Sequence, residues 1–205
     1  MDRRTLLIGA SIGAVLLPAG LAQAAPATVG QPALDFTLSD TAGKPVRLAD
    51  FRGRTVVLEW NNPGCPFVRK HYQGNMQALH KEAAAQGVVW LAINSTETAS
   101  GDYLSPQQLA RWMLDKQAAP TATLMDEDGV VGKAYGARVT PHMYIVNAQG
   151  ALVYAGAIDS IPSARVDDIP KATNHVRQAL ADIKAGKPVS VAATPPYGCT
   201  VKYKT

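Results

Sequence analysis

A cysteine placed between an apolar strand and an amphipathic helix constrains this chain more than any other feature. The apolar run 55–60 predicts a buried strand, and Cys65 follows it within the segment NNPGCP at 61–66. Apolar residues then recur at helical spacing, which predicts a helix over about 66–86 with one face toward a core. The start of a helix offers unpaired N–H groups and partial positive charge, which stabilise the nucleophilic thiolate. Cys65 is therefore the predicted site of chemistry.

Strands and helices alternate through the rest of the chain. Two short apolar runs, near 36–38 and 46–48, predict an N-terminal β-hairpin. The remaining expectations are strands at 88–93 and 121–125, a β-hairpin at 142–155, and helices at about 106–117, 130–135 and 170–185. A tail rich in proline and small residues runs over 188–205. This order predicts one α/β domain spanning residues 25–205.

The N-terminus has the pattern of an export signal. Arg3 and Arg4 precede a short apolar stretch, and the sequence AQA at 22–24 fits a signal-peptidase site. The apolar stretch is too short for a stable membrane span. We therefore expect residues 1–24 to be a cleaved signal peptide and the mature chain to be exported, to the periplasm in a bacterium. The arginine pair also resembles a twin-arginine signal, and an uncleaved anchor is the alternative.

Charge and cysteine count limit the possible partners. The formal net charge is +4, and it is spread without any basic run, so nucleic acid is not an expected partner. Cys65 and Cys199 are the only two cysteines. In an oxidising compartment they can form a disulfide. A bridge closing a loop of roughly 130 residues would stabilise the fold by ~4–5 kcal/mol on the chain-entropy account.

An apolar strand, a helix led by Cys65, then Thr140-Pro141 and a hairpin follow one another, and this order resembles the thioredoxin superfamily. Within it the chain is most similar to the exported redoxins and to the alkyl hydroperoxide reductase/thiol-specific antioxidant group. The stretch 126–156 resembles the part of that group that contains its cis-proline and hairpin, and NPGCP at 62–66 with GCTVK at 198–202 resembles a peroxiredoxin-like subgroup. The resemblance covers about 28–205. It implies a thioredoxin-like fold with an N-terminal β-hairpin extension and a C-terminal tail that contains a cysteine.

The resemblance also implies roles for three chemically active residues. Cys65 would attack a peroxide or a disulfide, and Cys199 would resolve the product from a tail mobile enough to swing. Glu59 lies six positions before Cys65. In thioredoxins an acid at that position is buried behind the cysteine and moves protons. The alternative for Glu59 is a strand residue that faces solvent, and the alternative for Cys199 is a permanent structural bridge.

The substrate-binding residues are also expected from the resemblance. Thr140 and Pro141 match the cis-proline position opposite the cysteine, where the backbone of Thr140 would be free to pair with an extended substrate. Arg138 lies just before them and would stabilise a thiolate or a polarised peroxide, with a surface arginine as the alternative, and Asn62 would offer a hydrogen bond. Val68 replaces the second cysteine of C-x-x-C, so reduction through an adjacent pair is excluded.

The peroxide pocket of peroxiredoxins is not reproduced in this sequence. Leu58 and Asn62 stand where P-x-x-x-T-x-x-C has proline and threonine. No cofactor is expected, and no metal, because Cys65 with His142 makes a poor site. A small-molecule or protein thiol must act as reductant. The leading hypothesis is a thiol oxidoreductase. Its alternatives are protein disulfide exchange and a redox-inert thioredoxin-fold binding module with a structural Cys65–Cys199 disulfide.

Overall fold

A mixed β-sheet forms the centre of the molecule. The computed structural model describes residues 26–204, so the expected signal peptide at 1–24 lies outside the described residues. Within that range a seven-stranded sheet has the order β2-β1-β5-β4-β3-β7-β8. Its strands are β1 (Thr37–Asp40), β2 (Pro45–Arg47), β3 (Val56–Trp60), β4 (Val89–Asn94), β5 (Ala122–Met125), β7 (His142–Val146) and β8 (Leu152–Gly156).

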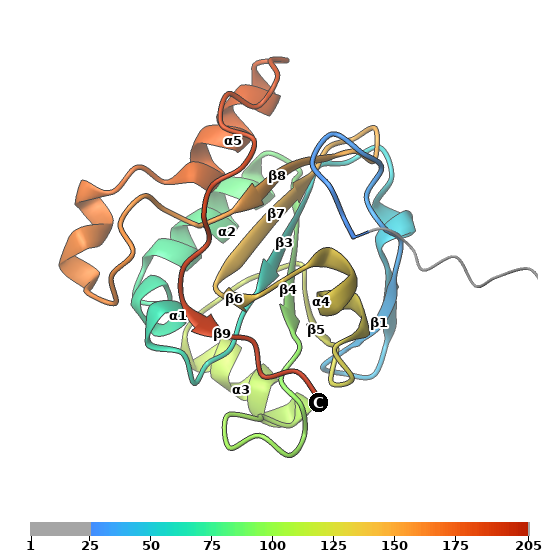
Figure 1. Cartoon of the computed structure of the whole chain (residues 1–205), viewed down its shortest axis with the longest axis vertical. Coiled ribbons are helices and arrows are strands. Elements are labelled where there is room, and N and C mark those ends of the chain that lie inside the picture. The colour runs from blue at the N-terminus through green and yellow to red at the C-terminus, as the bar shows by residue number, and fades with distance from the viewer. Residues whose placement is uncertain (1–25, 205) are drawn as a thin grey trace, which may run out of the picture.

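The central strands β3, β4 and β5 run parallel, and β7 lies antiparallel to β3 on the other side. β8 continues the sheet beyond β7, and the predicted N-terminal hairpin, β1 with β2, extends it beyond β5. This arrangement confirms the expected thioredoxin-like architecture with an added hairpin. It also places the end of β3, where Cys65 follows, in the middle of the sheet (Figure 1).

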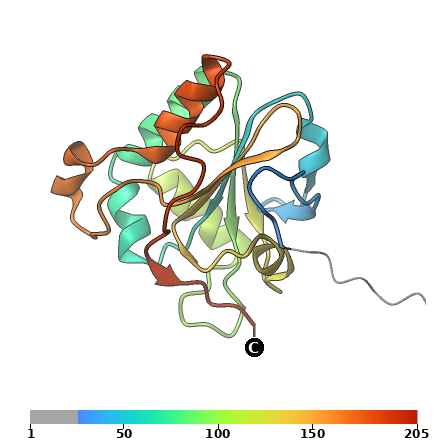
Figure 2. The ribbon, with the colours of Figure 1, turned by 45° about the horizontal axis from the view of Figure 1, so that its top comes forward.

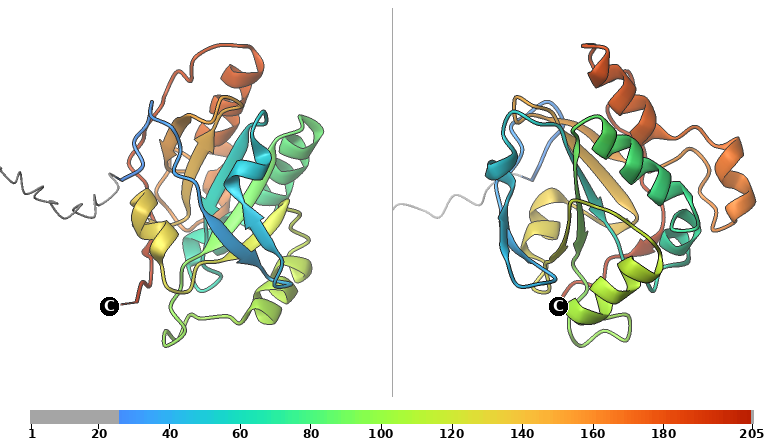
Figure 3. Two further views of the ribbon diagram at one scale, coloured as in Figure 1. Left: turned by 90° about the vertical axis from the view of Figure 1, so that its right-hand side faces the viewer. Right: turned by 180° about the vertical axis from the view of Figure 1, so that it is seen from behind.

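Helices cover both faces of the sheet (Figure 3). The helices are α1 (Pro66–His71), α2 (Asn75–Ala85), α3 (Pro106–Asp115), α4 (Val130–Tyr135) and α5 (His175–Lys184). The first three and α5 bury their apolar residues against one face, whereas α4 packs on the other face together with the N-terminal hairpin. Within residues 26–204, every helix is too short or too polar to serve as a membrane span.

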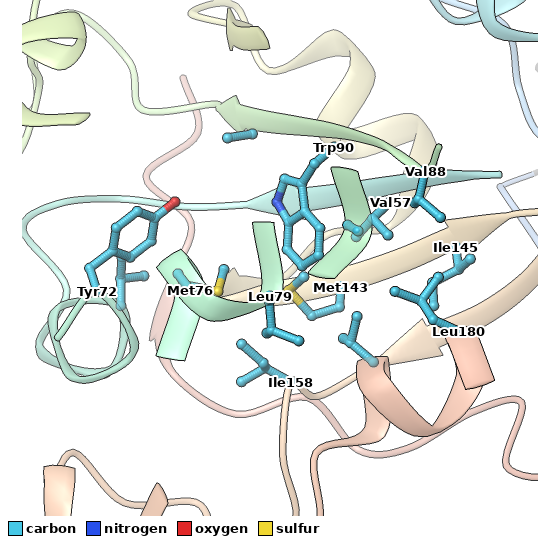
Figure 4. Packing of buried hydrophobic residues seen from close by; sticks show 14 of the residues in the cluster. Val57, Tyr72, Met76, Leu79, Val88, Trp90, Met143, Ile145, Ile158 and Leu180 are labelled. Atoms are coloured by element: carbon cyan, nitrogen blue, oxygen red, sulfur yellow. The ribbon is translucent and has the colours of Figure 1, made fainter. Parts of the chain in front are cut away.

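Side chains alternate between the two cores because successive residues of a strand point to opposite faces. In β3, Val57 packs in the core under α2, while Leu58 and Trp60 pack in the core under α4. Figure 4 shows Val57, Trp90 and other residues of the first core. Glu59 shares the face of Val57, so its carboxylate points toward the helices that follow Cys65.

The predicted single helix over 66–86 is wrong. The structure has two helices, α1 and α2, separated by a break that ends at Gly74. Gly74 adopts φ +111°, a conformation that glycine tolerates and other residues rarely adopt, and its N–H donates to the Gln77 side chain at 2.9 Å. The last helix also begins later than expected, at His175, because the Asn174 side chain caps it by accepting the Arg177 N–H.

Two short strands beside the sheet were not predicted. β6 (Val139–Thr140) pairs antiparallel with β9 (Cys199–Thr200) near the end of the chain. Figure 1 shows the C-terminal tail, in red, passing α1 before it reaches β6, and Figure 2 shows the same path from another direction. The tail therefore brings the second cysteine back to the region of the first.

Leu91 and Leu114 allow a matched test of the sheet core. Leu91 is fully buried in β4, whereas Leu114 is 67% exposed on α3. Leu91→Ala should lower the free energy of unfolding by ~2–5 kcal/mol, because the truncation leaves a cavity. Leu114→Ala should change it by less than about 0.5 kcal/mol. Urea denaturation followed by circular dichroism measures both, and equal losses would contradict the described packing.

Candidate active site

The loop between β3 and α1 fixes the position of Cys65. The Asn62 side chain accepts a hydrogen bond from the Gly64 N–H at 2.7 Å, and the Cys65 N–H donates to the Asn62 carbonyl at 2.9 Å. Pro66 occupies the first position of α1, where its missing N–H costs no hydrogen bond. Cys65 is therefore the N-cap residue of α1, as the sequence predicted.

The sulfur of Cys65 is closely surrounded by protein. Its side chain is 1% exposed, and the thiol donates to the Thr140 carbonyl oxygen at 3.0 Å. It accepts no hydrogen bond from the helix N–H groups in this form. The helix start, which was expected to stabilise a thiolate, therefore makes no direct hydrogen bond to the thiol. The immediate partner of the sulfur is the backbone of the opposite strand.

The Thr140–Pro141 peptide bond is cis, which confirms the expected cis-proline opposite Cys65. The expectation that the Thr140 backbone is free is wrong. β6 pairs with β9, and Thr140 lies opposite Cys199 in that pairing. The edge that an extended substrate was expected to occupy is thus already occupied by the chain's own tail.

Gly198 makes this approach of the tail possible. A Cβ atom at position 198 would lie 2.0 Å from the Thr140 carbonyl oxygen, closer than any real contact, and Gly198 has φ +142°. Only glycine fits both the space and the backbone conformation. The same carbonyl oxygen thus contacts the Cys65 thiol and the backbone just before Cys199.

Cys65 and Cys199 are free thiols, and both residues lie against Thr140. The pKa of Cys199 is raised well above its usual range. Burial is the main cause, followed by a hydrogen bond to Cys65 and by the charge of Cys65. Since the thiolate is the reactive form, Cys199 is a poor nucleophile while Cys65 is reduced. Oxidation of Cys65 removes two of these causes.

Glu59 is fully buried, so the alternative of a solvent-facing residue is wrong. Its carboxylate accepts hydrogen bonds from the Tyr72 hydroxyl at 2.9 Å and from the Trp90 ring N–H at 2.8 Å. His80 Nε2 lies 3.8 Å away and has no hydrogen-bond partner among residues 26–204. The Asn61 amide donates to the Tyr72 hydroxyl at 3.3 Å. A buried polar chain therefore leads from Glu59 to the loop that carries Cys65.

Two further residues expected at the site occupy different settings. Asn62 is buried, and its side-chain oxygen is engaged with the Gly64 N–H. The Arg138 side chain is exposed, while its carbonyl accepts the Val201 N–H of the tail. Within residues 26–204, the Arg138 side chain makes no hydrogen bond to either cysteine. Burial, followed by the positive charge of Arg138, lowers the pKa of His142 to about 4. The substrate-binding roles of both residues remain predictions.

No metal site is assembled near these residues. Within residues 26–204, no group of three or more His, Cys, Asp or Glu side chains lies placed to hold an ion. His142 instead contacts the Tyr144 hydroxyl at 3.2 Å.

Sequence reasoning missed a buried polar cluster that holds the tail. Lys70 Nζ lies 3.3 Å from the Asp159 carboxylate, and His71 Nε2 lies 3.7 Å from the same group. The Tyr197 hydroxyl donates to Asp159 and contacts His71 Nε2 at 3.2 Å. Asn75 fixes the other ring nitrogen of His71 at 2.8 Å. Lys70 and His71 are polar residues of a short helix whose Pro66 and Arg69 are exposed, so their burial had no signal in the sequence, and nothing there pointed to Asp159.

The cluster of Lys70, His71, Asp159 and Tyr197 joins Cys65's helix to Cys199's tail. Lys70 and His71 belong to α1, which begins just after Cys65. Tyr197 precedes Cys199 by two residues. The expected swinging tail is therefore docked in this structure, with an anchor immediately before the cysteine.

Comparison with known proteins gives consistent matches. The sequence model of the AhpC/TSA family matches residues 29–155. The thiol-disulfide oxidoreductase ResA of Halalkalibacterium halodurans is 27% identical over 127 residues, which are 62% of this chain and 67% of that protein. A protein of Mycobacterium tuberculosis whose name places it provisionally among the peroxiredoxins is 29% identical over 161 residues, which are 76% of this chain and 94% of that protein.

Solved structures match over a larger share of the chain. A hypothetical protein of Sinorhizobium meliloti superimposes with a TM-score of 0.73 at 26% identity, covering 87% of this chain and 96% of that one. A conserved protein of Geobacillus kaustophilus has the same TM-score at 29% identity, covering 86% and 93%. The fold therefore recurs nearly whole.

Buried histidines should make stability depend on pH. Burial lowers the pKa of His71 and of His142 from 6.5 to about 4. Between those values the unfolded chain binds protons that the folded chain does not, so stability falls as pH falls from 6.5 to 4. Each histidine should lower the free energy of unfolding by ~3 kcal/mol over this range, since each unit of pKa shift corresponds to about 1.36 kcal/mol. Urea denaturation at several pH values measures the decline.

The variant His142→Gln isolates one histidine in that experiment. It should remove ~3 kcal/mol from the decline between pH 6.5 and pH 4, because this group no longer titrates. The comparison is made as a slope, so any loss of stability at neutral pH does not affect it. A slope identical to that of the unaltered protein would contradict the assignment.

Proposed function

Because the chain belongs to the AhpC/TSA family and is a thiol-based oxidoreductase, we propose that it is an exported, peroxiredoxin-like enzyme. Cys65 is the nucleophile that reduces a peroxide or a disulfide, and Cys199 resolves the oxidised product. The observation that carries the proposal is the meeting of both thiols at Thr140. Cys65 donates to the Thr140 carbonyl, and Cys199 lies opposite Thr140 in the pairing of β6 with β9.

The peroxide reaction proceeds in two steps. The Cys65 thiolate attacks one peroxide oxygen, the O–O bond breaks, and the other oxygen leaves as water or an alcohol after taking a proton. Cys65 is then a sulfenic acid. The sulfur of Cys199 attacks that of Cys65, the S–O bond breaks, and water leaves, so that a Cys65–Cys199 disulfide remains. A disulfide substrate follows the same order, with a thiol as the first leaving group.

An external dithiol completes the cycle. It attacks the Cys65–Cys199 disulfide and is itself oxidised, which returns both cysteines to thiols. Export accords with this chemistry, because disulfides form and persist in an oxidising compartment. A reductant is needed there to return Cys65 and Cys199 to thiols. The signal-like residues 1–24 support export. A small-molecule or protein thiol is the required partner.

Glu59 is the proposed proton carrier. It is the buried carboxylate nearest in sequence to Cys65, and Tyr72 and Asn61 connect it to the cysteine loop. A carboxylate shielded from water can exchange a proton as the thiol ionises and the leaving group departs. The Tyr72 hydroxyl and the Trp90 N–H hold the carboxylate in place.

Intact mass with thiol trapping tests the cysteine assignments. Reduced protein treated with less than one equivalent of hydrogen peroxide should lose the mass of two hydrogen atoms as the disulfide forms. Cys199→Ser should instead gain one oxygen atom at Cys65, because resolution is blocked. Cys65→Ser should do neither. A Cys65 that is never oxidised, and never alkylates faster than Cys199, would end the enzyme proposal.

The same variants address the alternative, a redox-inert binding module locked by a permanent bridge. Such a protein would keep its disulfide under mild dithiol treatment. Cys199→Ser would then have a much lower melting temperature than the unaltered protein, because a bridge over such a long loop stabilises the fold by ~4–5 kcal/mol. The redox proposal predicts a readily reduced bond and a small change in melting temperature.

The charge of Glu59 can be removed while its shape is kept. Glu59→Gln should slow peroxide turnover by ~10²-fold or more, the usual contribution of a positioned proton carrier. The pH profile of turnover should also lose one limb, which a merely structural role would not cause. Glu82→Gln on the surface of α2 is the matched control. Unaltered turnover and an unaltered pH profile in Glu59→Gln would refute this role.

A further inference from the structure

The tail strand β9 occupies the place where a polypeptide substrate would bind. An extended substrate reaches a buried thiol by pairing with a free strand edge next to it. That edge here is β6, and β9 pairs with it through Thr140 and Cys199. We propose that β9 acts as a built-in competitor that restricts Cys65 to small oxidants and excludes polypeptide disulfides. The inference rests on the proposed function and specifies its substrate class.

The contact between tail and strand leaves no room for a second chain. Gly198 lies so close to the Thr140 carbonyl that a Cβ atom would be 2.0 Å from its oxygen. Cys65 donates to the same oxygen and is nearly inaccessible to solvent. A polypeptide therefore cannot pair with Thr140 until the tail leaves.

Anchors on both sides of Cys199 oppose that departure. On one side, the Tyr197 hydroxyl bonds to Asp159 and His71 inside the buried cluster. On the other side, the buried Val201 donates its N–H to the Arg138 carbonyl at 3.0 Å. Further along, the Tyr203 hydroxyl donates to the Ala137 carbonyl at 2.7 Å. Lifting β9 requires several of these bonds to break together.

The magnitude of the competition follows from the attachment of the tail. A segment tethered next to its binding site acts at an effective concentration of about millimolar. A free polypeptide at about micromolar concentration is therefore disadvantaged by a factor of ~10³ for the same edge. A small oxidant does not use the edge and does not meet this competition.

A small molecule has space near the cysteine loop. A cavity of about 230 Å³ is lined by Gly64, the residue before Cys65, and by Arg69, Asp102 and Trp112 among others. A water molecule occupies ~30 Å³ of liquid, so the cavity accommodates several molecules of peroxide size. Cys65 itself does not line this pocket, which reaches the neighbouring Gly64 and provides a nearby space for a small oxidant.

The test compares two disulfides that share a leaving group. Cystamine is the small probe, and an extended peptide whose central cysteine is capped with cysteamine is the polypeptide probe. All proteins carry Cys199→Ser, so each reaction stops at the mixed disulfide on Cys65. The readout is the rate constant for the peptide divided by that for cystamine. This ratio cancels any change in the nucleophilicity of Cys65.

Two variants loosen the tail in independent ways, and one controls for the added side chain. Gly198→Ala forces a Cβ atom against Thr140, and Tyr197→Phe removes the hydroxyl that anchors the tail. Gly43→Ala adds the same methyl group at another positive-φ glycine, with nothing within 4 Å. The ratio should rise at least ~10-fold in both loosened variants, as the tethered competitor weakens, and should stay constant in Gly43→Ala.

The outcomes separate this inference from the proposed function. An unchanged ratio in both loosened variants, or a ratio near one with the tail intact, overturns the role of the tail while leaving an active Cys65. A Cys65 inert to cystamine and to peroxide in every variant overturns both proposals. Circular dichroism checks folding, and Tyr197→Phe, which loses a single hydroxyl, carries the test if Gly198→Ala does not fold.

Discussion

The carbonyl oxygen of Thr140 is the point on which the site depends. It accepts the thiol of Cys65, it faces Gly198 at the distance that only glycine permits, and its residue pairs with Cys199. The cis peptide bond to Pro141 follows directly. The sheet holds this oxygen in place because β7 continues from Pro141 and pairs with β3, which leads to Cys65. The two cysteines, 134 positions apart in sequence, are thus aligned on one backbone group.

The buried cluster around Asp159 fixes the position of the tail more than it stabilises the fold. Moving an ammonium and a carboxylate out of water costs several kcal/mol for each ion, and their attraction only offsets that cost when the remaining hydrogen bonds are made. Here Lys70 also donates to the Ile161 carbonyl at 3.4 Å, and Tyr197 donates to Asp159. The hydrogen-bonding groups of the cluster are all paired only when the tail, with Tyr197, is in place. Its geometry therefore ties the position of the tail to that of α1.

The sequence predicted the framework of the fold and the centre of the site well, because both depend on local patterns. The apolar strand at 55–60, Cys65 at a helix start and the cis-proline at 141 all follow from short motifs, and the structure confirms them. The break at Gly74 was also visible as a glycine, but the continuing apolar stripe favoured one helix. Glycine's freedom at positive φ decided the outcome.

What could not be predicted depends on contacts between distant segments. Two-residue strands such as β6 and β9 have no periodicity to detect, and their pairing joins residues about sixty positions apart. Lys70 and Asp159 are separated by 89 positions. A charged residue in a helix normally indicates a solvent-facing side, and only the folded structure shows that this one is buried. The docking of the tail depends on these distant contacts. Because the sequence did not reveal them, it suggested a mobile tail instead.

The position of Cys199 after all the other strands has a consequence for biosynthesis. A polypeptide emerges from the ribosome beginning with its N-terminus. The seven-stranded sheet, Cys65 and the cis-proline are all encoded before α5, whereas β9 follows α5. During synthesis, Cys65 therefore exists without the segment that covers it. A nascent chain passes through a stage in which the strand edge at Thr140 is still open, and β9 closes that edge after α5 has been made.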